Sequence, residues 1–366
     1  MPTADELLGA SVVAQLVDSL ALAAPGRPAT TVARVASALP GMPLGERARA
    51  LRDALLADLP GDYVGFAAVV ARALADDPAF TGWLIWPVSE AVATLATTSE
   101  PPDFEAGIDL LGQLTTRLTG EFALRTFLAA DLDRTLAAVG AWTTHDNEHV
   151  RRLASEGTRP RLPWARRVPE LLSRPDVTVP LLDVLYRDGS EYVRRSVANH
   201  LNDLSRADPD LVTSTAKRWL AEPDQHTGAV VRHGLRTLVK AGDATALRLL
   251  GFGAPTEIEV GELRVTTPGV PTGGELSFTF TVTNRGVDAA TLAIDYVIHH
   301  RKANGTLAPK VFKLGVRTLG AGADATITRS HSFRPITTRR YYPGEHAVQV
   351  QINGTRYGNR EFELGG

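Results

Sequence analysis

The segment HVRRLASEG (His149–Gly157) has two later counterparts in the chain that align with it without gaps, YVRRSVANH (Tyr192–His200) and VVRHGLRTL (Val230–Leu238). Their shared valines lie 43 and 38 residues apart, at Val150, Val193 and Val231. A repeat of about 40 residues with two helices per unit is typical of HEAT-like α-solenoids, in which each unit packs on its neighbours. The repeat therefore predicts a HEAT-like helical stack in the middle of the chain.

Within each copy, side chains at helical spacing take different positions. The valine and the residues three and four places later, such as Leu153 and Ala154 after Val150, fall on one side of a helix and are predicted to pack against neighbouring repeats. The arginines face away from that side. The second helices of such a stack line a concave surface, which is suited to holding a long partner.

Two architectures follow one another along the chain. Residues 1–250 are rich in Ala, Leu and Arg and place apolar residues at helical spacing, as in ALRDALLADL (Ala50–Leu59). After Gly253 the pattern changes to period-two alternation, as in ELSFTFTVTNRG (Glu275–Gly286). About seven such strands over roughly 110 residues indicate an antiparallel Ig-like β-sandwich. The predicted fold class is mainly α, with a HEAT-like domain, a linker and a sandwich at residues 1–250, 251–257 and 258–366.

The composition is that of an ordinary globular protein, with 366 residues of which 44% are hydrophobic and 22% charged. The chain has no cysteine, so disulfides and thiolate metal sites are excluded and nothing points to an oxidising compartment. No run of about 18 uncharged apolar residues occurs. The first residues, MPTADELLGASVV, carry acids where a signal peptide carries basic residues. We therefore expect a cytoplasmic protein without a membrane span.

The formal net charge of −2 hides an asymmetry along the chain. Residues 1–149 hold 19 acidic and 9 basic side chains, whereas residues 150–240 hold 16 basic and 11 acidic ones. A basic middle segment in a near-neutral chain is what a local phosphate-facing surface requires. The alternative is a solvated face on which these arginines form ion pairs within their helices.

Acidic residues recur where adjacent repeats would bring them together. Arg152 and Glu156 are four residues apart, so they stack on one side of a helix. The next repeat carries a polar stripe at the same spacing, Arg195, Asn199 and Asp203. Glu121 opens a helix about one repeat earlier and is expected to line the same trough. The alternatives are a surface ion pair of small energy for Arg152 and Glu156, and a favourable helix N-terminal charge for Glu121.

The loop GTRPRLPW (Gly157–Trp164) is expected to be extended and stiff, because the residue before each proline is driven out of the helical region. Arg159 and Arg161 then project from a rigid frame, with Trp164 close behind. Guanidinium groups on a fixed loop suit phosphate oxygens, and an indole beside them suits a base or sugar. The alternative places Trp164 in the core as a plug between helix pairs.

Three segments carry a resemblance to a known family: LTGEFALRTFL, HDNEHVRRLASEGTRPRLPWA and YVRRSVANHLNDLS. They resemble the AlkC branch of the HEAT-like repeat DNA glycosylases, and the resemblance is dense from about residue 80 to residue 240. The chain is similar to the form with a C-terminal Ig-like domain. The resemblance implies a monofunctional glycosylase that removes cationic N3-methylated bases from duplex DNA, chiefly 3-methyladenine with 3-methylcytosine as a second candidate. We expect it to act as a monomer.

The resemblance also implies roles for individual residues. Those at the positions of the family's catalytic carboxylates are Glu121, Glu156 and Asp203. Those predicted to contact DNA are Arg152, Arg159, Arg161, Trp164, Arg194, Arg195 and Asn199. No metal or cofactor is expected. HDNEH (His145–His149) resembles a ligand run only superficially, because it lacks a third ligand.

The chemistry of these residues fits that role. A cationic methylated base is a good leaving group, so help is needed at the sugar, which becomes oxocarbenium-like as the bond breaks. Ionised carboxylates stabilise that charge and orient water. No lysine beside them suggests Schiff-base chemistry, so hydrolysis without strand cleavage is expected. The alternatives are a non-enzymatic solenoid scaffold and a DNA-damage-binding protein without activity.

Two basic, aromatic segments of the second domain are further candidates for DNA contact. They are HHRKANGTLAPKVFK (His299–Lys313) and TTRRYYPGEH (Thr337–His346). Either has the composition to enter a groove or contact phosphates. The alternative is that both are ordinary exposed hairpin tips.

Overall fold

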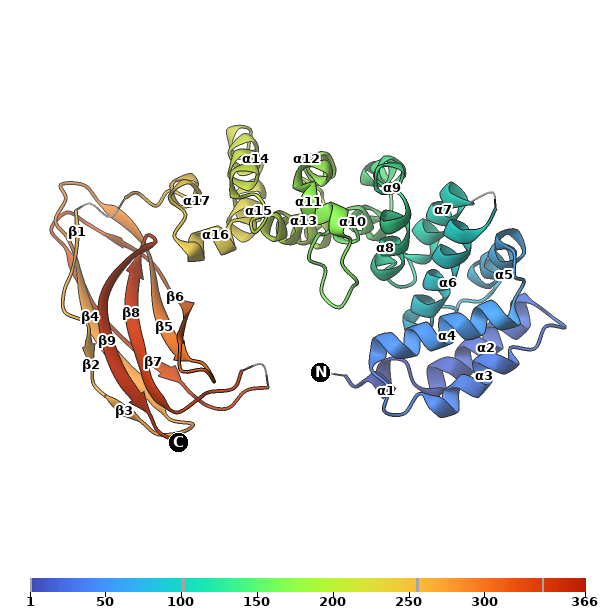
Figure 1. The fold of residues 1–366 in the computed structure, drawn as a ribbon. Coiled ribbons are helices and arrows are strands. Elements are labelled where there is room, and N and C mark those ends of the chain that lie inside the picture. The colour runs from blue at the N-terminus through green and yellow to red at the C-terminus, as the bar shows by residue number, and fades with distance from the viewer. Residues whose placement is uncertain (1, 101–102, 255–256, 338) are drawn as a thin grey trace. The chain divides into compact units, whose positions relative to one another are not determined.

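The computed structural model describes residues 2–100, 103–254, 257–337 and 339–366 (Figure 1). The chain forms two compact units, Met1–Gly234 and Leu235–Gly366, which we call the helical unit and the sandwich unit. The sandwich unit begins with two short helices, before its first strand at Ile258. The predicted domain limits at residues 250 and 258 stay a prediction, and residues 255–256 of the predicted linker lie outside the described residues.

The helical unit consists of helices joined by short turns. Its α-helices are α1 (Ala4–Leu7), α2 (Ala10–Ala23), α3 (Thr30–Val35), α4 (Leu44–Asp58), α5 (Tyr63–Asp76), α6 (Ile85–Thr98), α7 (Phe104–Leu114), α8 (Glu121–Ala130), α9 (Leu132–Gly140), α10 (Glu148–Glu156), α11 (Pro169–Ser173), α12 (Val179–Leu185), α13 (Glu191–Leu204), α14 (Pro209–Ala221) and α15 (Thr227–Gly234). Its 3-10 turns are η1 (Ala36–Ala38), η2 (Gly82–Leu84), η3 (Ala141–Thr144) and η4 (Pro175–Thr178).

The first two repeated segments lie in α10 and α13, and the third runs from the second half of α15 into α16 (Arg236–Ala241). Helices α10, α13 and α15 lie in one layer, while α12 and α14 lie in a second (Figure 1). Helix α13 packs against α10 on one side and α15 on the other. The shared valines, Val150, Val193 and Val231, are all buried at these contacts. The predicted helical repeat stack is therefore confirmed. Side-chain caps fix where its helices begin, as when the Asn147 side chain accepts a hydrogen bond from the His149 amide at the start of α10.

The N-terminal helices include an apolar stretch, Ala4–Ala23, that by length and composition alone would suffice to cross a membrane. The stretch is interrupted between α1 and α2, and Val13, Leu16 and Leu20 on α2 are buried in the helical unit. Helix α2 packs against α5. Packing within the core therefore accounts for the apolar character of these helices.

The sandwich unit holds two sheets. Its strands are β1 (Ile258–Val260), β2 (Arg264–Val265), β3 (Gly269–Val270), β4 (Glu275–Asn284), β5 (Ala290–Arg301), β6 (Leu307–Leu319), β7 (Asp324–Ser332), β8 (Gly344–Ile352) and β9 (Thr355–Leu364). In one sheet β7 pairs with one edge of β4, and β1 and β2 pair with the other. The second sheet has the order β3-β9-β8-β5-β6. Alternate residues of β4, among them Leu276, Phe278 and Phe280, enter the core between the sheets.

The predicted antiparallel Ig-like sandwich is confirmed, with one local exception. The short strand β3 runs parallel to β9, whereas the longer strands pair antiparallel. Helices α16 (Arg236–Ala241) and α17 (Ala244–Leu249) dock on one end of this unit. There Gln351 donates a hydrogen bond to the Lys240 carbonyl, and Gly242 approaches Gly354 so closely that a Cβ on either would clash with the other's backbone. These contacts explain why both short helices belong with the strands.

Candidate functional site

Three carboxylates and two arginines alternate in one row across α8, α10 and α13. Glu121 Oε2 lies 2.6 Å from Arg152 Nη1, and Arg152 Nη2 lies 3.5 Å from Glu156 Oε1. Arg159 continues the row, with Nη1 2.6 Å from Glu156 Oε1 and Nε 2.9 Å from Asp203 Oδ2. We call these five residues the ion row. The structure thus brings all three predicted carboxylates, from three separate helices, into one connected cluster.

The side chains of the ion row are largely removed from solvent. Their exposed fractions lie between 8% and 14%. The alternative of a solvated surface pair is therefore wrong for Arg152 and Glu156. Buried ion pairs contribute little net stability, because desolvating the charges offsets their attraction. With three acids and two bases, the row also carries one more negative charge than positive.

Two carboxylates of the ion row lie where a helix disfavours them. Glu156 is the last residue of α10, and Asp203 is the last but one of α13. The C-terminus of a helix has a partial negative charge, so an anion there is unfavourable. Glu121 is instead in the first turn of α8, where a carboxylate is favoured, and Thr119 Oγ1 donates to it at 2.9 Å. Stability alone does not explain acids at both C-terminal positions, which favours a functional role.

The prediction that Arg159 projects from its loop is wrong. The side chain is buried and turns inward onto Glu156 and Asp203, because these two buried carboxylates are within its reach. Burial by itself would lower the pKa of Arg159, but hydrogen bonding to Asp203 and the charges of both carboxylates more than offset it and raise that pKa. Arg159 is therefore a permanent cation inside the row rather than a free group on the loop.

Arg152 is held inside the helical layer as well. Its Nη1 also donates to Thr119 Oγ1 at 2.9 Å, and its guanidinium lies 5.0 Å from the ring centre of Tyr192. Arg161 is half-buried on the loop, and its Nε finds no hydrogen-bond partner within the described part of the chain. Contact of either arginine with DNA stays a prediction.

A buried histidine fixes α10 against α13 next to the ion row. The pKa of His200 is lowered to about 3, chiefly because the ring is buried, so the ring is neutral. One of its nitrogens, Nδ1, lies 2.8 Å from the Ser155 carbonyl and so donates to it. The other, Nε2, then accepts from the Thr178 hydroxyl at 3.0 Å. Ser155 precedes Glu156, so His200 locks the backbone that carries this carboxylate.

Trp164 stands out from the loop beside the ion row. Its side chain is exposed (75% for the residue), so the alternative of a core plug is wrong. Its φ of +62° lies in the left-handed region, which is strained for a residue of this size. A pocket of about 220 Å³ opens here, lined by Trp83, Leu118, Thr119, Glu121, Phe122, Glu156, Pro163 and Trp164. An exposed indole held in a strained conformation next to two carboxylates favours a ligand contact.

Trp86 on α6 packs against two aromatic residues that line this pocket, Trp83 and Phe122. The Trp86 ring stacks on Phe122 with 4.3 Å between ring centres, and Trp86 Nε1 donates to Glu90 Oε1 at 2.8 Å. Burial raises the pKa of Glu90, against the hydrogen bond from Trp86 and the charge of Arg52. Sequence reasoning missed these residues. The signal available was WLIWPVSE, which places two tryptophans and a glutamate at helical spacing.

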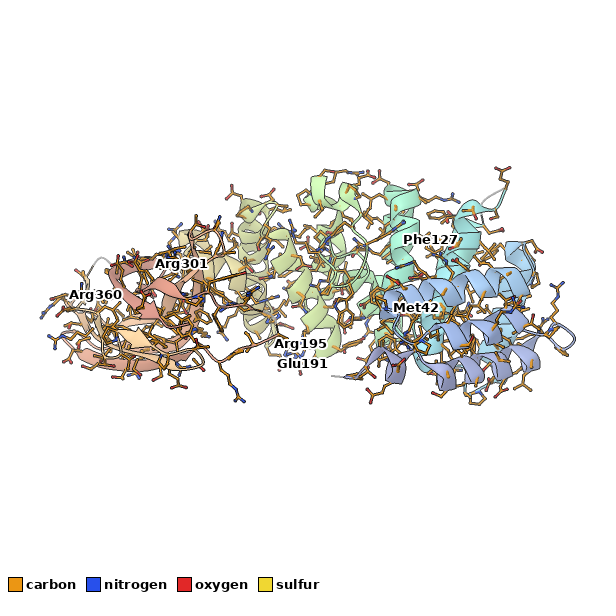
Figure 2. All side chains as sticks on the ribbon, turned by 60° about the horizontal axis from the view of Figure 1, so that its bottom comes forward. Met42, Phe127, Glu191, Arg195, Arg301 and Arg360 are labelled. Carbon is orange, nitrogen blue, oxygen red and sulfur yellow. The ribbon has the colours of Figure 1, made fainter. Side chains whose placement is uncertain are left out.

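The polar stripe of α13 borders a second hollow. A groove of about 400 Å³ between α13 and α15 is lined by Glu191, Arg194, Arg195, Ala198, His226, Ala229, Val230 and His233. Arg195 is exposed there, on the same side of α13 as Glu191 (Figure 2). Arg194 instead donates to the carbonyls of Asp188 and Gly189, and Asn199 shares a 2.9 Å hydrogen bond with His233. Of these predicted DNA contacts, Arg195 has the guanidinium best placed for a ligand.

The basic segments of the sandwich unit surround a cluster of histidines. Arg339 donates to His300 Nε2 at 3.1 Å, and Arg340 lies over the ring of Tyr342. Residue 338 of the second segment lies outside the described residues. Burial lowers the pKa of His300 to about 3 and that of His331 to about 4, with the charge of Arg339 as the second cause. DNA contacts of these segments stay a prediction.

The histidine run at His145–His149 has local partners. His145 Nδ1 accepts from the Asn147 amide at 3.0 Å, and the His149 ring packs edge-on against Tyr192. Within the residues that the structure describes, no group of three or more His, Asp or Glu side chains is arranged to hold a metal ion.

Comparison with known proteins gives three results. Residues 259–366 match a family described as the C-terminal Ig-like domain of the uncharacterised protein YhaZ. The chain is 37% identical to the uncharacterised protein YhaZ of Bacillus subtilis (strain 168) over 327 residues, which cover 89% of this chain and 88% of that one. It also matches a solved structure over all of both chains, with a TM-score of 0.89 and 36% identity. That structure is the alkylpurine DNA glycosylase AlkC of Pseudomonas fluorescens bound to DNA containing an abasic site analog.

Proposed function

The chain belongs to the family of YhaZ and AlkC, in the form with a C-terminal Ig-like domain, and on that premise we propose that it is a DNA glycosylase of alkylation repair. The observation that carries the proposal is the ion row, in which three carboxylates from three helices, each with a side chain at most 12% exposed, meet beside a pocket with an exposed tryptophan. A scaffold has no need to gather buried acids at helix C-termini.

The proposed substrates are cationic N3-methylated bases in duplex DNA, chiefly 3-methyladenine, with 3-methylcytosine as the second candidate. Such a base already carries a positive charge, so it leaves with the electron pair of the C1′–N bond without a strong general acid. The sugar then becomes oxocarbenium-like, and the ionised carboxylates of the ion row stabilise it. Water adds at C1′ and gives up its proton to the carboxylate that orients it, which is Glu121, Glu156 or Asp203.

The proposed reaction is hydrolysis alone. The ion row contains no lysine, so it offers no amine for a Schiff base with the abasic sugar, and strand cleavage is not part of the proposal. Trp164 and Arg195 are the proposed DNA contacts with the strongest support, since both side chains are exposed beside the two hollows of the helical unit. A single chain acting on duplex DNA in the cytoplasm completes the proposal.

The test is release of methylated bases from duplex DNA by the wild type and by Glu121→Gln, Glu156→Gln and Asp203→Asn. We expect each variant to lose about 100- to 1000-fold in the single-turnover rate, while binding to duplex DNA with an abasic-site analog is largely kept. Asp133→Asn is the matched control, because Asp133 is an exposed carboxylate paired with Arg174 on the same unit. If the wild type binds damaged DNA without releasing a base, the protein is a damage-binding protein. If it does neither, the scaffold alternative gains.

A further inference from the structure

A second buried arginine lies outside the ion row and pairs with backbone rather than with acids. Arg125 is on α8, one helical turn after Glu121, and is 1% exposed. Its Nη1 donates to the carbonyls of Gly157 at 3.1 Å and Arg159 at 2.8 Å, and its Nε donates to the carbonyl of Arg166 at 3.2 Å. One guanidinium therefore holds both ends of the loop between α10 and α11.

Burial of the Arg125 guanidinium is unfavourable for the stability of the fold. Among the described residues, no carboxylate lies within ion-pair distance of Arg125, and its Nη2 is buried without a hydrogen-bond partner. Burial lowers the pKa of Arg125 to about 10, with Arg167 and Arg166 adding to the effect, so the group stays charged at neutral pH. A buried cation without a counter-ion is costly, and an apolar side chain would serve stability better.

The loop that Arg125 holds carries groups that need a fixed position. Arg159 lies at its start and joins Glu156 to Asp203, and Trp164 lies further along with its strained backbone. The bonding is also reciprocal, since Arg166 Nη2 donates back to the Arg125 carbonyl at 3.1 Å. Because Arg125 shares α8 with Glu121, it ties the helix of one carboxylate to the loop beside the other two.

We infer that Arg125 is a positioning residue, which holds the loop 157–166 so that Arg159 and Trp164 keep their places relative to the three carboxylates. The inference rests on the proposed function for its effect on catalysis, but not for its effect on the loop. Without Arg125 the loop loses three backbone anchors. Arg159 then no longer holds Glu156 and Asp203 at one spacing, and a shift of about 1 Å at a catalytic group can lower a rate about 100-fold.

The experiment compares Arg125→Met, which removes the anchors, with Arg125→Lys, which keeps the charge but lacks the guanidinium fork that reaches the carbonyls at both ends of the loop. The control is Arg47→Met. Arg47 is also 1% exposed and also donates to two backbone carbonyls, those of Met42 and Leu8, but it lies among the N-terminal helices. Unlike Arg125, it also has a carboxylate partner, with Nη2 2.6 Å from Asp5 Oδ1. It therefore reproduces the general effect of deleting a buried arginine without touching the loop.

Two measurements are made on the full-length protein: amide hydrogen exchange in peptides covering 157–167, and the single-turnover rate of base release. We expect Arg125→Met to exchange faster in the loop and to react about 10- to 100-fold more slowly, with Arg125→Lys in between. Arg47→Met should match the wild type in both measurements.

If the loop amides of both Arg125 variants exchange at the wild-type rate, the inference is overturned. It is also overturned if Arg47→Met speeds exchange in this loop as much as Arg125→Met does. If Arg125→Met does not fold, the Arg125→Lys result decides by the same criteria. Failure of the proposed function looks different, because the wild type itself then releases no base while the loop exchange still reports on Arg125.

Discussion

Polar side chains cluster in the interior of both units, but the ion row of the helical unit keeps its members charged, whereas the histidine cluster of the sandwich unit is kept neutral. In the ion row every buried carboxylate has an arginine within 3.5 Å. In the sandwich unit His331 and His346 are buried and His300 half-buried, and desolvation lowers the pKa of each. Ion pairing with arginine favours the charged form of the carboxylates, whereas burial among aromatic rings favours the neutral form of the histidines. The two units should therefore respond differently to a lost partner and to pH.

The largest effect is expected when the pairing in the helical unit is broken. Arg159→Met leaves Glu156 and Asp203 facing each other without the cation between them, so we expect the helical unit to lose about 3–5 kcal/mol of stability. All five tryptophans lie in this unit, so urea unfolding followed by tryptophan fluorescence reports on it alone. Arg174→Met, which breaks an exposed pair with Asp133, should change little. If Arg159→Met and Arg174→Met lower the free energy of unfolding equally, burial of the ion row does not increase the cost of breaking its pairs.

The next effect is acid destabilisation of the sandwich unit. Folding lowers the pKa of His300 to about 3 and of His331 to about 4, so their contribution to stability is fully present above about pH 6.5 and is lost as the pH falls. We expect the calorimetric transition of the sandwich unit to shift down more between about pH 7 and pH 5 than that of the helical unit, where His200 acts in the same direction. His331→Gln should flatten the pH dependence. A steeper shift in the helical unit would reverse the comparison.

A smaller effect of opposite sign comes from Asp295 on β5. Burial raises its pKa to about 6, against the charges of Lys313 and Lys240, so the folded state is favoured at low pH and loses this contribution as the pH rises through 6. Asp295→Asn removes the ionisation. We expect the variant to gain on the wild type between about pH 4 and pH 6 in urea unfolding of the sandwich unit, with the gain levelling off above the folded pKa. A constant difference across that range would show that Asp295 does not titrate there.

The smallest change in stability is expected at Trp164. Its exposed indole contributes little packing, and its positive φ costs about 1 kcal/mol for a non-glycine residue. Trp164→Gly should leave the midpoint of helical-unit unfolding unchanged or slightly higher, while DNA affinity falls. The control is Trp219→Gly. Trp219 is buried, so its replacement should strongly destabilise the helical unit. A marked loss of stability in Trp164→Gly would point to a structural role instead.

Much of the fold follows from local patterns. The 43- and 38-residue spacing of the valines identifies the stacked helices, and period-two alternation identifies the long strands, because both patterns record which side of an element faces a core. The meeting of Glu121, Glu156 and Asp203 was also within reach of the sequence, since each is placed by a helix whose position in the repeat is known.

Loop side chains and buried anchors could not be predicted in the same way. The inward turn of Arg159 depends on Asp203, which is 44 residues away and lies on another helix. Arg125 and His200 are polar residues within apolar helix faces, and the pattern alone does not say whether such a residue meets a partner, a carbonyl or solvent. For Arg125, the sequence signal was its place in EFALRTFL, where the nearby apolar residues Leu124 and Phe127 are buried.

The charge on the carboxylates of the ion row bears on turnover. A cationic methylated base would be attracted to these carboxylates, whereas the free base and the abasic sugar formed in the proposed reaction are both uncharged. The attraction that draws in the damaged nucleotide would therefore vanish once the glycosidic bond is hydrolysed. The same carboxylates would therefore favour capture of the lesion and departure of its uncharged products, without a conformational change.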